Sequence, residues 1–225
     1  MQSGRAQTGF TMIEMAIVLA MIGVIVAIAV PSFDRYRSLE EAKETATEIA
    51  AALRRARSLA VKEGVPYLVI FNPNQSGAAI PAPNPPVDPG ALARVVRDAN
   101  ADSRETGGET VFEIIPQRMA SFGVTPYRGP GIHPAAPRIG TDVQGGTLNG
   151  IAEGANFPID GTTGVPAVAF TPRGVAVPLG ALQNLGAGAG SYYVTDNNHA
   201  VFAATVGPLG AVRIRAYSPG ANAWR

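Results

Sequence analysis

Glu14 is the strongest candidate for a functional residue in this sequence, because it is a single carboxylate within an apolar run. It lies in "TGFTMIEMAIVLAMIGVIVAIAVPSF", residues 8–33, where it is the only charged residue from Met12 to Val30. A carboxylate within lipid costs about 2.5 kcal/mol or more, and such residues usually have a partner and a function. We therefore favour an ion pair for Glu14 over the alternative that it only extends toward polar headgroups from the start of the segment.

The rest of the sequence lacks the residue patterns of enzymes and metal sites. The absence of cysteine excludes disulfides, thiolate nucleophiles and cysteine zinc sites. His133 and His199 do not have the spacing of metal ligands, and no phosphate loop, Gly-x-Ser-x-Gly, His-Glu-x-x-His or dinucleotide motif is present. One acidic group does not match a calcium loop and is expected to be solvated: Asp88, Asp98, Asp102 and Glu105. We predict a protein that is not an enzyme and that uses no cofactor or metal.

The apolar run around Glu14 has the length of a membrane anchor. Its nineteen residues from Met12 to Val30 would extend about 28 Å as a helix, close to the thickness of a bilayer core. A cleaved secretory signal would have a more basic start and a shorter apolar core, whereas Arg5 is the one cation before this run. A buried helix that is apolar on all sides would need a larger core around it. We predict a single membrane span over residues 10–33 with a cytoplasmic N-terminus.

The stretch "GFTMIEM", residues 9–15, resembles the type IV prepilin processing site, whose usual form is Gly-Phe-Thr-Leu-Ile-Glu-Leu. Met12 and Met15 stand where leucines are common. The resemblance implies that prepilin peptidase cleaves between Gly9 and Phe10, removes a leader of residues 1–9 and N-methylates Phe10. It also implies that Pro31, 21 residues after Phe10, is the proline at which pilin helices commonly kink.

Such a cleavage would supply a partner for Glu14. The new amine at Phe10 would lie four residues before Glu14, a spacing that brings two groups together on a helix. The carboxylate could also reach the terminal amine of a neighbouring subunit, and the resemblance to pilins favours this second version. Because a paired charge in lipid costs much less than an unpaired one, the ion pair would set the axial register between subunits.

Residues 34–64 have the pattern of an amphipathic helix that continues from the anchor. Apolar residues recur at spacings of three and four: Leu39, Ala42, Ala46, Ile49, Leu53, Ala56 and Ala60. The alanines form a shallow stripe that suits packing on a sheet, and Gly64 and Pro66 are expected to end the helix. A basic cluster lies mainly off this stripe, and a solvated helix face is favoured over a nucleic-acid site: Arg54, Arg55, Arg57 and Lys62.

Residues 65–225 have the pattern of a β-rich head. Strands or strand pairs are predicted over residues 65–71, 110–116, 165–179, 191–206 and 210–217. Residues 72–93 and 118–164 are rich in glycine and proline and are expected to form long loops. The predicted fold class is α+β and pilin-like, with a long N-terminal helix, half transmembrane and half amphipathic, packed on one face of an antiparallel β-sheet.

The stretch "ARSLAVKEGVPYLVIF", residues 56–71, resembles the helix end and first strand of GspH/FimT-like minor pseudopilins. This implies a subunit that waits in the inner membrane with its head in the periplasm. Secretion machinery then assembles it with other pseudopilins into a type II secretion pseudopilus. The alternative is a minor pilin of a type IV pilus.

FimT-like subunits in some bacteria take part in DNA uptake, and this suggests a further alternative for the C-terminal segment. Arg213, Arg215 and Arg225 lie near Tyr217 and Trp224 in the sequence and form a candidate surface for phosphates and stacked bases. An ordinary solvent-facing strand is the interpretation that we weigh above it.

Overall fold

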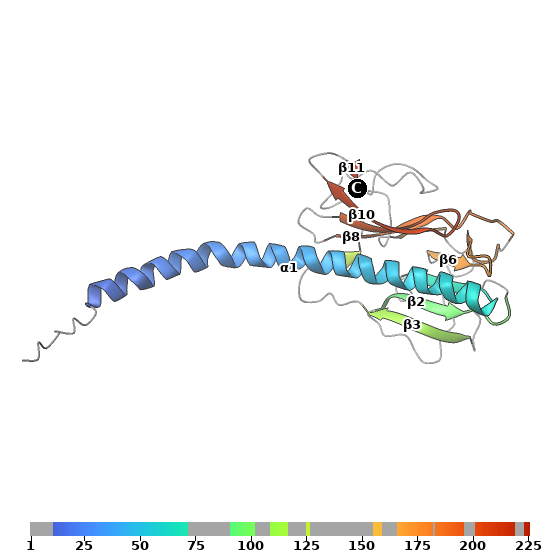
Figure 1. Ribbon diagram of the computed structural model, residues 1–225, viewed down its shortest axis with the longest axis horizontal. Helices are drawn as coiled ribbons and strands as arrows, with labels where there is room; N and C mark the ends of the chain where they lie inside the picture. The colour runs from blue at the N-terminus through green and yellow to red at the C-terminus, as the bar shows by residue number, and fades with distance from the viewer. Residues whose placement is uncertain are drawn as a thin grey trace, which may run out of the picture. The chain divides into compact units, whose positions relative to one another are not determined.

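The computed structural model describes residues 11–71, 91–101, 109–116, 125–126, 155–158, 166–181, 183–195, 201–218 and 223–225. The chain divides into two units, Met1–Arg37 and Ser38–Arg225. One helix of 52 residues, α1 (Met12–Glu63), begins in the first unit and ends in the second (Figure 1). Its backbone is helical through Pro31, whose side chain lies outside the described residues.

The described residues of the first unit form the N-terminal part of α1. The large apolar side chains from Met12 to Ile28 are 48–94% exposed. Because successive helix residues are rotated by about 100°, this run presents apolar side chains in every direction. Within the described part of the chain, no helix combines the length and the apolar character needed to cross a membrane. The membrane span over residues 10–33 stays a prediction.

The C-terminal end of α1 is set by Gly64. Its φ of +70° lies in the left-handed region, and its N–H donates to the carbonyl of Ala60 at 3.1 Å. This is a common way to close the last turn of a helix, because glycine adopts that conformation without a steric penalty. The buried Pro66 then leads into the first strand. The predicted helix end is confirmed.

The second unit contains two sheets in which all strand pairs are antiparallel. The five-stranded sheet has the order β3-β2-β1-β6-β7. Its strands are β1 (Tyr67–Phe71), β2 (Ala91–Arg97), β3 (Thr110–Pro116), β6 (Ala167–Phe170) and β7 (Ala176–Val177). The six-stranded sheet has the order β11-β10-β9-β8-β4, and β5 also pairs with β8. Its strands are β4 (Thr125–Pro126), β5 (Ala155–Asn156), β8 (Gly190–Thr195), β9 (Val201–Val206), β10 (Val212–Ser218) and β11 (Ala223–Trp224).

The core of the second unit joins α1 to both sheets. The apolar stripe of the helix is fully buried except for Leu39, which is half-buried. The buried helix residues are Ala42, Ala46, Ile49, Ala50, Ala52, Leu53, Ala56 and Ala60. These residues form one cluster with side chains of the five-stranded sheet, such as Val168, and of the six-stranded sheet, such as Ala204. Figure 1 shows this part of α1 between strands of the two sheets. The ring of Phe71 on β1 stacks on Tyr192 of β8, with centroids 5.1 Å apart, and so connects the two sheets directly. The predicted α+β, pilin-like class is confirmed.

Two expectations about the head are wrong in detail. We expected one sheet with one face on the helix, whereas the helix packs against two sheets. We also assigned Ala91–Ala93 to a long loop, whereas these residues begin β2. The strand lacks the alternation of a half-exposed strand because both of its faces are covered: Leu92 and Val95 face the helix cluster, and Val96 packs in a separate cluster. Short strands β4 and β5 also lie within the expected loop of residues 118–164.

The prediction that the acidic group is solvated is also wrong for one of its members, Asp98. Asp98 is fully buried directly after β2, and its backbone N–H donates to the carbonyl of Pro66 at 3.1 Å. Its burial follows from the pairing of β2 with β1, which draws the end of β2 against the start of β1. Asp88, Asp102 and Glu105 lie outside the described residues. Within those residues, no group of three or more acidic or histidine side chains could hold a metal ion.

Candidate functional site

Glu14 lies in the first turn of α1 and is held by Thr11. The Thr11 backbone N–H donates to Glu14 Oε2 at 2.9 Å, and the Thr11 hydroxyl donates to the same oxygen at 2.8 Å. In return, the Glu14 N–H donates to the Thr11 hydroxyl oxygen at 3.3 Å. Thr11 therefore occupies the N-cap position and Glu14 the third helical position, and together they form a reciprocal capping box. The arrangement satisfies backbone N–H groups at a helix start that would otherwise lack partners.

Thr11 is the functional candidate that the sequence analysis missed. The signal was present, since Thr11 and Glu14 have the Thr-x-x-Glu spacing of a capping box directly before an apolar run. The predicted cleavage residues Gly9 and Phe10 lie outside the described residues. The ion pair between Glu14 and the Phe10 amine therefore stays a prediction, and the capping box gives Glu14 a partner within its own chain.

The basic cluster of α1 contacts both sheets and is not simply a solvated face. Arg57 donates from Nε to the carbonyl of Gly174 at 2.9 Å and from Nη2 to the carbonyl of Leu209 at 3.3 Å. Gly174 closes the turn between β6 and β7, and Leu209 lies in the turn between β9 and β10. One half-buried guanidinium thus binds a turn from each sheet.

Two neighbouring arginines make further contacts with the strands. Arg55 forms an ion pair with Glu113 of β3 at 2.6 Å, and Arg54 donates to the carbonyl of Val212 on β10 at 3.4 Å. Sequence spacing alone could not show this, because the arginines sit beside the apolar stripe and their long side chains reach over it to the sheets. The expectation of a solvated face is corrected for these residues.

A polar cluster joins the end of α1 to the first two strands. Arg97 Nε donates to Glu63 Oε2 at 2.9 Å, and Arg97 is the cross-strand partner of Tyr67. The hydrogen bond from Arg97 lowers the pKa of Glu63 below its ordinary value of 4.5, and a hydrogen bond from Tyr67 lowers it further. Burial raises the pKa of Tyr67 above 10, and its hydrogen bond to Glu63 raises it more. Arg97 thereby offsets the unfavourable position of a carboxylate at a helix C-terminus.

The C-terminal candidates for DNA binding come together on β10 and β11. Arg213 and Arg215 alternate with Val212 and Ile214, which pack toward the helix cluster, as the sequence predicts. Arg225 is brought beside them because its backbone exchanges two hydrogen bonds of 2.9 Å with Ala216. Arg213 and Arg225 are exposed, whereas Arg215 is half-buried.

The aromatic residues of this segment form a packed group. Trp224 lies against Tyr217 and Tyr193, with ring centroids 5.4 and 5.7 Å apart. Tyr217 is buried and Trp224 is half-buried. These rings therefore stabilise the outer face of the six-stranded sheet, and the exposed chemistry of the segment comes from its guanidinium groups.

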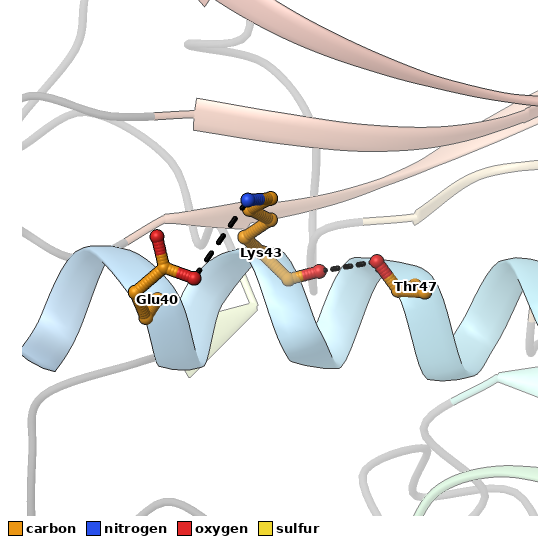
Figure 2. A network of polar contacts seen from close by, with 3 residues as sticks. All are labelled: Glu40, Lys43 and Thr47. Carbon is orange, nitrogen blue, oxygen red and sulfur yellow. Dashed lines mark hydrogen bonds and ion pairs between the residues drawn. The ribbon is translucent and has the colours of Figure 1, made fainter.

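Polar side chains between residues 40 and 48 lie together on the solvent-facing side of α1 in the second unit. Lys43 forms an ion pair with Glu40 at 3.7 Å, and the Thr47 hydroxyl donates to the carbonyl of Lys43 at 2.7 Å (Figure 2). With Glu44, Glu48 and Ala51 these residues line a shallow groove of about 480 Å³. We call it the acidic groove.

The N-terminal region matches a known sequence family. The family described as the prokaryotic N-terminal methylation motif matches residues 4–30. These residues include the predicted cleavage position, Thr11 and Glu14. No solved structure matches the chain significantly.

Several curated proteins are similar to part of the chain. The fimbrial protein of Pseudomonas aeruginosa is 40% identical over 60 residues, which are 27% of this chain and 38% of that protein. The type IV major alpha-pilin of Moraxella bovis is 46% identical over 46 residues, which are 20% of this chain and 29% of that protein. The chain thus matches well under half the length of each relative. Over these parts of its length, the chain is similar to the methylation motif and to type IV pilins.

Proposed function

We propose that this protein is a GspH/FimT-like minor pseudopilin that is processed by prepilin peptidase and assembled into a type II secretion pseudopilus. The observation that carries the proposal is the methylation motif over residues 4–30, with Glu14 held at the start of a long helix. In this function the chain is a structural subunit and not an enzyme. Prepilin peptidase cleaves between Gly9 and Phe10 and methylates the new amine of Phe10.

The capping box gives a physical account of Glu14 before and after processing. In the precursor, Thr11 satisfies the carboxylate, so the charge has hydrogen-bond partners within the apolar segment. Both bonds use Oε2, and we assign Oε1 to the amine that cleavage creates on Phe10 or on the next subunit. Because the amine would carry a charge opposite to that of the carboxylate, this ion pair would fix the register of neighbouring helices.

The apolar surface of the first unit supports the proposed location. Large side chains from Met12 to Ile28 are exposed on all sides of the helix, which is costly in water. Lipid in the inner membrane and then neighbouring helices in the filament would cover them. The head, which begins at about residue 65, would lie in the periplasm.

Processing can be tested by the mass of the N-terminus. We expect the chain, expressed with an active prepilin peptidase, to begin at Phe10 and to carry one added methyl group. Gly9→Val should leave the full precursor, because a branched side chain at the cleavage position would obstruct the peptidase. Gly4→Val is the matched control within the leader and should be processed normally. An intact Met1 terminus in the unmutated chain would overturn the proposal.

A type IV pilus is the alternative assembly. Its support is that the relatives are named as fimbrial proteins and a type IV pilin. The same processing is expected in both systems, so the filament in which the chain is found decides between them. DNA binding would belong to this alternative, and the exposed Arg213 and Arg225 are the residues that would contact phosphates.

A further inference from the structure

The last turns of α1 carry a groove whose lining is cationic and apolar. It has a volume of about 520 Å³ and is lined by Arg54, Arg57, Ser58, Val61 and Lys62. Successive turns contribute these residues at spacings of three and four, so they share one face of the helix. Three of them are cations and none is a carboxylate. We call this surface the basic groove.

Two turns of the sheets border the basic groove. Gly174 lies in the turn between β6 and β7, and a Cβ placed on it would lie 3.1 Å from Arg57 Nε and 3.2 Å from Val61 Cγ2. The turn between β9 and β10 reaches the same place, because Arg57 Nη2 donates to the carbonyl of Leu209 at 3.3 Å. Both turns therefore lie against side chains that line the groove.

Aliphatic side chains are exposed on the helix and on these turns. Val61 is 54% exposed and Leu209 is 74% exposed. Leu185 is 55% exposed, and at the next residue, Gly186, a Cβ would lie 3.2 Å from the Cβ of Pro208, which precedes Leu209. Apolar side chains that gather on one part of a protein surface are typical of sites that another protein covers.

The charges around the basic groove favour carboxylates as ligands. Arg173 adds a further exposed cation directly before Gly174. Glu63, the acidic residue that follows Lys62 in the helix, is bound by Arg97 at 2.9 Å. Arg57 is half-buried, and partial burial strengthens the attraction between a cation and a carboxylate because less water screens it.

We propose that the basic groove and its two bordering turns bind an acidic segment of another protein. An apolar side chain of that segment would lie on Val61 and Leu209, and its carboxylates would meet Arg54, Lys62 and Arg173. An apolar centre with a polar rim is the usual composition of a protein interface. The complementary charges would speed the encounter and fix the orientation of the segment.

A nucleic acid is the competing ligand. Its phosphates would also be attracted by the cations. It would nevertheless leave the aliphatic side chains of Val61 and Leu209 without a partner. Bases of a single strand bind by stacking on aromatic rings, and none of the residues that line the groove is aromatic. The mixture of cations and aliphatic side chains therefore favours a protein segment.

A model peptide can test the proposed ligand chemistry. The probe is a fluorescent peptide of alternating glutamate and leucine, and fluorescence anisotropy measures its affinity for the full chain in a neutral detergent, with the detergent alone as blank. We expect saturable binding that weakens as salt is added. Replacing either the glutamates by glutamine or the leucines by serine should weaken binding by about fivefold or more.

A single-stranded oligonucleotide of the same charge is measured beside the peptide. No binding of the glutamate–leucine peptide, equal binding of either altered peptide, or tighter binding of the oligonucleotide would overturn the proposal. None of these measurements depends on cleavage after Gly9, so their outcome is independent of the proposed function.

Charge reversal at the two lysines of the chain locates the binding surface. Lys62→Glu changes the basic groove and should weaken peptide binding by about fivefold or more. Lys43→Glu is the matched control, because it makes the same change of net charge in the acidic groove and should leave the affinity unchanged. Far-UV circular dichroism of both variants checks that they fold. Equal losses for the two variants would contradict the proposal, because binding would then follow net charge and not the groove.

Discussion

At the scale of single residues, Glu14 has one role that the structure shows and one that we propose. Its carboxylate closes a capping box with Thr11. We propose the same carboxylate as the partner of the amine that cleavage would release. If prepilin peptidase cleaves as proposed, the capping box would lie at the start of the mature chain.

The capping role of Thr11 gives the first residue-scale prediction. Thr11→Val removes the hydroxyl that donates to Glu14 and accepts from its N–H, at a cost of about 1 kcal/mol to the helix start. We expect faster hydrogen exchange at the amides of Met12 to Met15 in the full chain. Thr47→Val is the matched control, because Thr47 bonds within the helix interior, at the carbonyl of Lys43. Unchanged exchange at Glu14 in Thr11→Val would refute the capping role.

Glu63 gives a second prediction at this scale, through the pH dependence of stability. Its pKa is lowered in the folded chain by the hydrogen bond from Arg97. The group therefore stabilises the fold above its unfolded pKa near 4.5 and loses this effect as the pH falls through the lower, folded pKa.

The measurement is urea unfolding of the full chain in detergent at pH 6 and pH 3. We expect Glu63→Gln to be less stable than the unmutated chain at pH 6 and to approach it at pH 3. Arg97→Gln should show the same convergence, since it removes the other partner. If the gap between Glu63→Gln and the unmutated chain is as large at pH 3 as at pH 6, the ion pair is not its source.

At the scale of secondary-structure elements, the sequence predicts strands better than it predicts their pairing. Alternation in "VRIRAY" and the β-branched run "YLVIF" identify β10 and β1, because side-chain character reports which face is covered. Side-chain character does not indicate which strands form hydrogen bonds with each other. The division into two sheets therefore could not be predicted. The sequence analysis did not predict β2. Both faces of this strand are buried, and a stretch rich in glycine and proline precedes it.

In the candidate site too, contacts between residues close in sequence could be predicted, whereas contacts between distant residues could not. The methylation motif and Glu14 are local patterns and were found from the sequence, and the Thr11 partner was locally encoded too. The contacts of Arg57 join residues 117 and 152 positions apart, and no local pattern encodes them. Predicting them requires knowledge of how the two sheets lie on the helix.

At the scale of the whole second unit, Arg57 and two tight turns hold the helix and both sheets together. Gly210 has a φ of +75°, and a Cβ placed on it would lie 2.1 Å from the carbonyl oxygen of Gly174. The turn between β9 and β10 therefore contacts the turn between β6 and β7 with no room for a side chain. Arg57 donates to both turns from the helix, so one residue couples three elements that are distant in sequence.

This coupling predicts unequal effects for two neighbouring arginines. Arg57→Met should lower the free energy of unfolding by about 1–3 kcal/mol, because two carbonyls lose a charged donor where the turns meet. Arg54→Met is the matched control and should change the free energy of unfolding by less than about 0.5 kcal/mol, since Arg54 is exposed and its bond to Val212 is long. Urea unfolding of the full chain in detergent measures both. Equal losses for the two variants would show that helix charge, rather than the bonds of Arg57, stabilises the head, because both substitutions remove one positive charge from the same part of α1.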